Sequence, residues 1–238
     1  QSRGTTEGFA EDYAFLIQGL IDLYEASFEL RWLQWAVRLQ ATMDELFWDG
    51  ERGGYFNSAA GDASILLRLK EDYDGAEPAP SSVAAMNLLR LGAVFDHGGT
   101  HFAPGTKKAG SPFAQDTGAP SPPKEGYRER GRRCIEAFRA QWSAAPQAMP
   151  QLLCALELAL EPPRHVVLAG DPESGDFRVL KAVLHERVGM RRAVLVVPAK
   201  GTGEWQWWVE RAPWLAEMEP GDGRATAYVC EEFSCQAP

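Results

Sequence analysis

The stretch Glu11–Phe47, EDYAFLIQGLIDLYEASFELRWLQWAVRLQATMDELF, decides the fold of this chain. Apolar residues recur in it every three or four positions, first within 13–24 and again within 32–46. This spacing places them on one face of an α-helix. Little more than residues 28–30 separates the two stripes, so the two helices must run antiparallel and side by side. The stretch therefore predicts a helical hairpin, the unit of α-hairpin repeats and toroids.

The residues that follow the hairpin predict short connecting segments and then a third helix. Glycines and proline interrupt the helical pattern, and hydroxyl side chains are suited to cap a new helix. The predicted segments are a turn at 47–56, a short β-like run at 64–69, an acidic loop at 71–80, and a helix from Ser81 or Ser82 to about Phe95. That helix is apolar on nearly every side, which predicts that it is buried.

The last part of the chain changes to a strand pattern. Residues 165–169 and 193–197 are continuous apolar runs, typical of strands that are buried on both faces, and a helical stripe lies between them over 177–188. These three segments predict a βαβ unit. A helix over 205–218 and a third strand over 225–230 would extend it into a small α/β subdomain.

The composition describes an acidic protein. The chain has 238 residues, enough for one large or two small domains, and a net charge of −9. Residues 1–96 hold 16 acidic and 7 basic side chains, so they carry the whole excess. Such a field repels phosphate backbones, which argues against nucleic-acid binding. No apolar run approaches the ~18 residues of a membrane span, and residues 1–25 lack the layout of a signal peptide.

Strings of residues along the chain carry a family resemblance. They are Glu-Asp-Tyr-Ala-Phe-Leu at 11–16, Leu-Phe-Trp-Asp at 46–49, Gly-Gly-Tyr-Phe at 53–56, Asn-Leu-Leu-Arg-Leu at 87–91 and Ala-Tyr-Val-Cys-Glu at 227–231. In this order they resemble the spermatogenesis-associated protein 20 family, whose bacterial relatives join a thioredoxin-like domain to an (α/α)6 toroid. The resemblance implies that the chain is the C-terminal part of such a protein, with the thioredoxin-like domain and the first hairpins upstream.

The fold class that follows is mainly α with a C-terminal α/β part, namely a partial (α/α)6 toroid of the six-hairpin glycosidase-like kind and a small βαβ subdomain. The expected domains are toroid hairpins at 1–96, a disordered insertion at 97–124, the last toroid helices at 125–162 and the α/β subdomain at 163–238. The insertion is expected to be disordered because it holds five Gly and five Pro residues and no periodic apolar positions.

The resemblance places candidate cavity-lining side chains at one end of the toroid. They are Glu11, Asp12, Tyr13, Trp48, Tyr55, Lys70, Asp72 and Asp74. Carboxylates beside aromatic rings can bind or protonate a sugar, and glycoside hydrolysis needs two carboxyl groups about 5–9 Å apart. Structural interpretations stay open, because acidic residues favour a helix N-terminus, an acidic turn can simply be solvated, and aromatic residues at a turn often close a core. The sequence identifies no catalytic residue.

Cys230 and Cys235 are the candidate redox residues, as the only close cysteine pair. Their spacing is neither that of a thioredoxin-type motif nor that of a zinc knuckle, so we expect no metal site and no cofactor. We expect two separate reduced thiols, which the adjacent Glu231 and Glu232 favour. The alternative is a redox pair that works with the upstream domain. Four cysteines in the chain favour a reducing compartment such as the cytoplasm.

Three functional hypotheses follow, of which the third is that this fragment is a splice product with no function of its own. In the first, the chain is part of a toroid related to carbohydrate metabolism, which binds, hydrolyses or epimerises a sugar in the intact protein. In the second, it is a non-catalytic scaffold, or a redox-linked module that binds partners of the thioredoxin-like domain. The expected partners are a carbohydrate and that upstream domain, with neither a nucleic acid nor a membrane.

Overall fold

A computed structural model describes residues 8–61, 65–96, 125–161, 163–186, 192–231 and 234–236. The predicted insertion at 97–124 lies outside these residues. The β-like run predicted from residue 64 is described only from Ile65, and residues 65–70 form no strand. That prediction is wrong over the described part, because the side chains of Arg68 and Lys70 and one backbone hydrogen bond from Asn57 hold this segment in place of a strand ladder.

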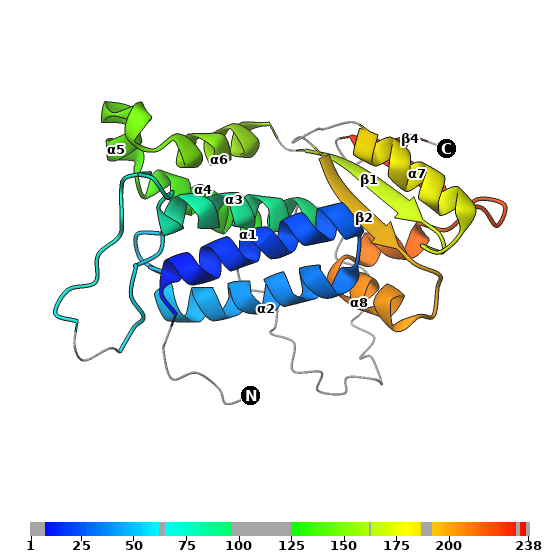
Figure 1. Ribbon diagram of the computed structural model, residues 1–238, viewed down its shortest axis with the longest axis horizontal. Coiled ribbons are helices and arrows are strands. Elements are labelled where there is room, and N and C mark those ends of the chain that lie inside the picture. The colour runs from blue at the N-terminus through cyan, green and yellow to red at the C-terminus, as the bar shows by residue number, and fades with distance from the viewer. Residues whose placement is uncertain are drawn as a thin grey trace, which may run out of the picture.

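A helical hairpin opens the described part of the chain, as predicted. α1 spans Ala10–Ser27 and α2 spans Leu30–Phe47. Phe28 is the C-cap of α1; it has a left-handed φ of 62°, and its backbone N–H donates to the Tyr24 carbonyl at 2.6 Å. This tight link reverses the chain, so α2 packs along α1 (Figure 1).

The third predicted helix, α3, spans Pro80–Phe95 and is buried on nearly every side. Its start differs from the prediction, because Ala79 rather than a serine occupies the N-cap position. The Ser81 hydroxyl instead exchanges hydrogen bonds with the backbone of Tyr55, accepting from its N–H at 2.9 Å and donating to its carbonyl at 3.2 Å. The serine therefore ties the helix to the 47–56 turn.

Further helices surround α3. They are α4 at Tyr127–Glu136, α5 at Arg139–Ala144 and α6 at Pro150–Leu160, with a short 3-10 turn, η1, at Pro146–Ala148. α1, α4 and α6 all contact α3, which makes it the centre of the helical layer. This half of the molecule is mainly helical, with the α1–α2 hairpin on one side of the buried helix α3 and with α4 and α6 also packed against it (Figure 1).

The C-terminal part forms a mixed sheet of strand order β2-β1-β3-β4. Its elements are β1 at Arg164–Ala169, α7 at Gly175–Glu186, β2 at Arg192–Val197, α8 at Gly203–Arg211, the 3-10 turn η2 at Pro213–Glu217, β3 at Thr226–Glu231 and β4 at Ser234–Gln236. β1 and β2 are parallel, and β3 is antiparallel to β1. The predicted βαβ unit is therefore confirmed.

The sheet shares its core with the helices. Val167 and Leu195 belong to the same buried cluster as α1, α3 and α6, whereas Val166 and Leu168 face a second cluster with α7. This alternation is what a strand with both faces covered requires. The phenol of Tyr24 in α1 adds a link, because it donates to a backbone carbonyl of β2 at 3.1 Å. The α/β part thus packs as one layer of the molecule (Figure 1).

Candidate functional site

The 47–56 turn collects several of the predicted site residues. Trp48 and Tyr55 face each other across an isolated β-bridge, with their ring centroids 5.0 Å apart. Gly53 and Gly54 both have φ of 75°, and a Cβ on Gly53 would lie 2.6 Å from the Arg133 carbonyl oxygen. The turn therefore needs glycine to pack against α4. Tyr55 is fully buried, so it closes a core and offers no surface on which a sugar ring could stack.

Beneath the turn lies a buried polar network that the sequence analysis missed. The Tyr55 hydroxyl donates to Asp44 Oδ1 at 2.5 Å, and Gln40 Nε2 donates to the same oxygen at 2.9 Å. The Arg130 guanidinium from α4 pairs with the other oxygen of Asp44. Burial raises the pKa of Asp44, although Arg130, Tyr55 and Gln40 all act in the opposite direction. α2 and α4 each carry several charged residues, and nothing in the sequence distinguishes Asp44 or Arg130 from the others.

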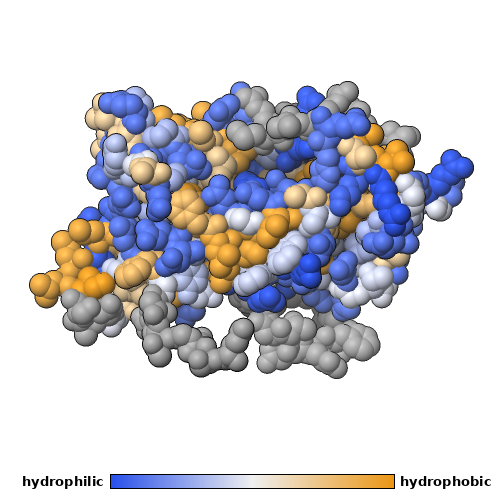
Figure 2. All heavy atoms as spheres, viewed as in Figure 1, coloured by the Kyte–Doolittle hydropathy of each residue, from blue (hydrophilic) through white to orange (hydrophobic). Residues whose placement is uncertain are grey.

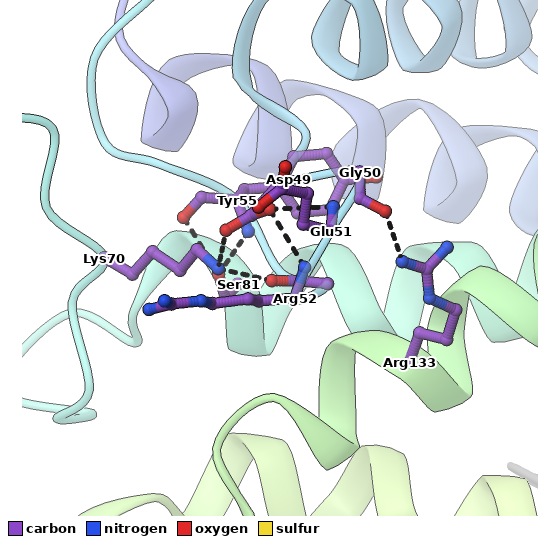
Figure 3. Close-up of polar contacts among 9 residues, drawn as sticks. Asp49, Gly50, Glu51, Arg52, Tyr55, Lys70, Ser81 and Arg133 are labelled. Carbon is purple, nitrogen blue, oxygen red and sulfur yellow. Dashed lines mark hydrogen bonds and ion pairs between the residues drawn. The ribbon is translucent and has the colours of Figure 1, made fainter.

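Lys70 is held at the turn by two acceptors (Figure 3). Its ammonium lies 2.7 Å from Asp49 Oδ2 and also donates to the Gly53 carbonyl. Asp49 Oδ1 accepts the backbone N–H groups of Glu51 and Arg52, both at 3.0 Å. Partial burial would raise the pKa of Asp49, but the hydrogen bonds from Lys70 and the two backbone groups outweigh it and lower that pKa. Lys70 therefore stabilises the turn.

Asp74 is a helix cap, and Asp72 is solvent-exposed. Asp74 Oδ2 accepts the backbone N–H groups of Gln151 at 2.8 Å and Leu152 at 3.3 Å, at the start of α6. Its Oδ1 accepts the N–H of Ala79 at 2.9 Å, immediately before α3. A carboxylate in this position satisfies helix-terminal donors and the positive end of the helix dipole. One buried side chain thus joins two helices.

The three candidates in the first turn of α1 are also structural or solvated. Glu11 is exposed, and Asp12 accepts the backbone N–H of Phe9 at 2.8 Å. Tyr13 is half-buried, with its ring centroid 5.5 Å from that of Phe47. The structure brings Trp48, Tyr55 and Lys70 to one turn, where the Tyr55 hydroxyl and the Lys70 ammonium are hydrogen-bonded to other groups of the protein.

A groove of about 390 Å³ lies elsewhere, between α1, α3, α6 and the start of β2. None of the eight predicted residues lines it. Arg90 of α3 crosses it, with Nη2 2.7 Å from Asp22 and 3.0 Å from Glu25, both in α1. Ile21 and Leu91 line its apolar surface, and Figure 2 shows hydrophobic residues gathered over the middle of this face of the molecule. The acidic pair three positions apart was visible in the sequence, but nothing in the sequence placed Arg90 beside it.

The cysteine prediction is wrong for Cys230, which is disulfide-bonded. Cys235 lies directly opposite it in the antiparallel register of β3 and β4, where paired residues come close enough for a bridge. Cys134 and Cys154 are free, and burial raises the pKa of Cys134 to about 12.

The described residues show neither a metal centre nor a membrane-spanning helix. Within those ranges, no three His, Cys, Asp or Glu side chains gather where they could hold a metal ion. None of the helices described is both long enough and apolar enough to cross a bilayer.

Comparison with known proteins shows which proteins this chain resembles in sequence. No protein-family model matches it. It is 37% identical over 236 residues to human spermatogenesis-associated protein 20, with 97% of this chain aligned, and 35% identical over 240 residues to the mouse protein, with the whole chain aligned. The chain is homologous to part of spermatogenesis-associated protein 20.

The chain spans only 26% of the length of human and mouse spermatogenesis-associated protein 20. An uncharacterized protein from Caenorhabditis elegans is also similar, 29% identical over 238 residues, with 28% of its own length covered. The family resemblance that the sequence strings indicated is thus confirmed. The names of these relatives describe no reaction and no ligand.

Proposed function

We propose that this chain is a non-catalytic packing module of a longer spermatogenesis-associated protein 20-like protein, as one part of an array of helical hairpins such as an (α/α)6 toroid. The observation that carries the proposal is the outer face of α1. Phe15, Leu16 and Leu23 are exposed there, around Gly19. A Cβ atom added to Gly19 would have no heavy atom within 4 Å. Helices in closed or stacked arrays need apolar neighbours on both sides.

The contrast with α3 supports this interpretation. α3 has α1, α4 and α6 around it and is buried on nearly every side, whereas α1 packs mainly against α2 and α3 among the described helices. A glycine between large apolar residues leaves room for a second helix to approach closely. The rest of the longer protein, including the thioredoxin-like domain that the family resemblance implies, would supply that neighbour.

Self-association tests the proposal, because a second copy can substitute for a missing neighbour. We expect sedimentation equilibrium to show concentration-dependent association of the chain that Leu16→Ser/Leu23→Ser abolishes. Val179→Ser/Val183→Ser, which removes two exposed valines from α7, is the matched control and should leave association unchanged. A chain that stays monomeric at about 100 μM and binds no apolar dye would contradict the proposal.

The groove supports carbohydrate binding as a second candidate function. Its volume lies in the usual range for small-ligand sites, about 300–1,000 Å³. Asp22 and Glu25 can accept hydroxyl hydrogen bonds, Arg90 can donate them, and the apolar wall can contact the face of a sugar ring. This arrangement favours binding of a sugar. We assign no pair of groove residues as the acid and base of a hydrolysis reaction.

Calorimetric titration with a panel of mono- and disaccharides tests this second function. Binding should be lost in Arg90→Met and kept in Arg211→Met, which changes a half-buried arginine of α8 outside the groove. Binding that Arg90→Met leaves intact, or no binding to any sugar, would reject the carbohydrate function without affecting the packing proposal.

A further inference from the structure

The segment 65–73, here called the leucine loop, presents its apolar side chains to solvent and its basic ones to the protein. Leu66, Leu67 and Leu69 are 102%, 70% and 62% exposed. Arg68 between them donates from Nε to the Ser58 carbonyl and from Nη2 to the Leu46 carbonyl, both at 2.9 Å. This reverses the usual order, in which apolar side chains are buried and charges are solvated.

The leucine loop is anchored to the rest of the molecule. The backbone N–H of Asn57 donates to the Leu69 carbonyl at 2.9 Å, and Asn57 Oδ1 accepts the N–H of Glu71 at 3.1 Å. The Asn57 carbonyl in turn accepts the N–H of Ala10 at 3.1 Å, at the start of α1. The leucines therefore stand at a fixed position beside the first turn of α1, where Phe9 is also exposed. The loop projects from the end of the helical layer in Figure 1.

Four exposed charges of the leucine loop and of the first turn of α1 are acidic, and Arg52 is an exposed basic residue at the adjoining 47–56 turn. Glu71 and Asp72 are the exposed charged residues of the loop, and Glu11 and Asp12 are those in the first turn of α1. The two basic residues of the loop, Arg68 and Lys70, are already bound to Ser58, Leu46, Asp49 and Gly53. An anionic lipid surface would be repelled by such a rim, whereas a cationic partner would be attracted.

We propose that the leucine loop is a docking surface for a basic amphipathic helix of another protein. The leucines and Phe9 would bury the apolar face of that helix, and its lysines or arginines would pair with Glu71, Asp72 and Glu11. Interfaces of this kind usually have apolar side chains at the centre and charged side chains around them. The surface adjoins the outer face of α1, because Phe9 lies seven residues before Leu16, but its leucines stand on the loop outside that helix, so the proposal goes beyond the packing function.

A labelled synthetic peptide tests the proposal with the full chain. The probe is a helix of leucines and lysines with leucines at helical spacing, and the control peptide carries glutamates in place of the lysines. We expect fluorescence anisotropy to show binding of the basic peptide only. Leu67→Ser/Leu69→Ser should weaken it at least tenfold, while circular dichroism and thermal unfolding show an unchanged fold, because both side chains are exposed.

Charge reversal separates a specific rim from the general acidity of the chain. Glu71→Lys/Asp72→Lys should weaken binding of the basic peptide and create binding of the acidic one. Glu204→Lys/Glu210→Lys makes the same change in net charge on exposed positions of α8 and should alter neither.

Three results would overturn the proposal. They are failure of the basic peptide to bind, equal loss of binding in the α8 variant, and leucine-dependent binding to phosphatidylcholine–phosphatidylserine vesicles in place of the peptide. The last result would assign the loop to a membrane surface instead.

Discussion

The 47–56 turn and the outer face of α1 look opposite in sequence and in structure. The turn region, with Lys70 and Asp74 beside it, is rich in charged and aromatic residues of the kind that catalysis uses. In the structure, however, Lys70 and Asp74 bind other groups of the protein. α1 reads as an ordinary amphipathic helix, yet part of its apolar side is exposed. The difference teaches that a side chain is available for function only when the fold leaves it without a partner.

The largest expected effect in the turn region is the loss of Arg130. Arg130→Met leaves the Asp44 carboxylate buried without its guanidinium, which should lower the free energy of unfolding by about 3–5 kcal/mol. Urea unfolding measures it. The matched control is Arg90→Met, whose carboxylate partners are exposed and which should cost about 0.2–1 kcal/mol. Equal costs for the two arginines would mean that the buried network is not what stabilises this region.

Asp74 should have the next largest effect. Asp74→Ala removes the acceptor for three backbone N–H groups and should cost about 1.5–3 kcal/mol. Asp72→Ala, at an exposed position two residues away, should change stability by no more than about 0.5 kcal/mol. If Asp74→Ala instead kept full stability while abolishing sugar binding, Asp74 would be a ligand-binding residue after all.

Lys70 should determine part of the acid sensitivity of the fold. The pKa of Asp49 is lowered in the folded protein, so its contribution to stability is present above its unfolded pKa of about 3.9 and is lost as the pH falls through its folded pKa. Lys70→Met should cost about 1–2 kcal/mol at neutral pH and make stability fall less steeply as the pH drops below about 4.

The control for this pH dependence is Lys200→Met. It removes an exposed pair with Glu219 and should leave the slope unchanged. Unfolding midpoints at several pH values check both variants, and the same slope in wild type and Lys70→Met would contradict the prediction.

The smallest effect should come from the α1 face, and it should be a gain in stability. Gly19→Ala fills open space in a helix interior, so it should stabilise the isolated chain by about 0.5–1 kcal/mol. The added methyl group should also weaken self-association, because it blocks close approach of a second helix. Gly92→Ala is the contrast. Its added Cβ would lie 2.8 Å from the backbone nitrogen of Arg128, so this substitution should destabilise the chain. Stronger self-association of Gly19→Ala would contradict the prediction that a second helix packs closely against this face of α1.

Local patterns in the sequence were sufficient for the helical hairpin at 11–47, the buried helix up to Phe95 and the βαβ unit. The reason is that helical and strand periodicities depend on neighbouring residues and on burial alone. The strings at 11–16 and 227–231 likewise carried the family resemblance, because residue order is itself a property of the sequence. Neither the periodicities nor the strings required knowledge of which helix lies beside which.

Only the tertiary structure decided which side chains were already bound and which were free. Asp44 meets Arg130 across 86 positions, and Asp74 meets Gln151 across 77, so no local pattern predicts that these carboxylates are structural. The same holds for the groove at Arg90 and for the exposed leucines at 66–69, whose environment depends on α1 and the 47–56 turn. Pairing over such distances is set by how the layers pack. The packing determined that the charged side chains of the turn are bound within the protein, whereas the apolar side chains on α1 and the leucine loop are exposed to solvent.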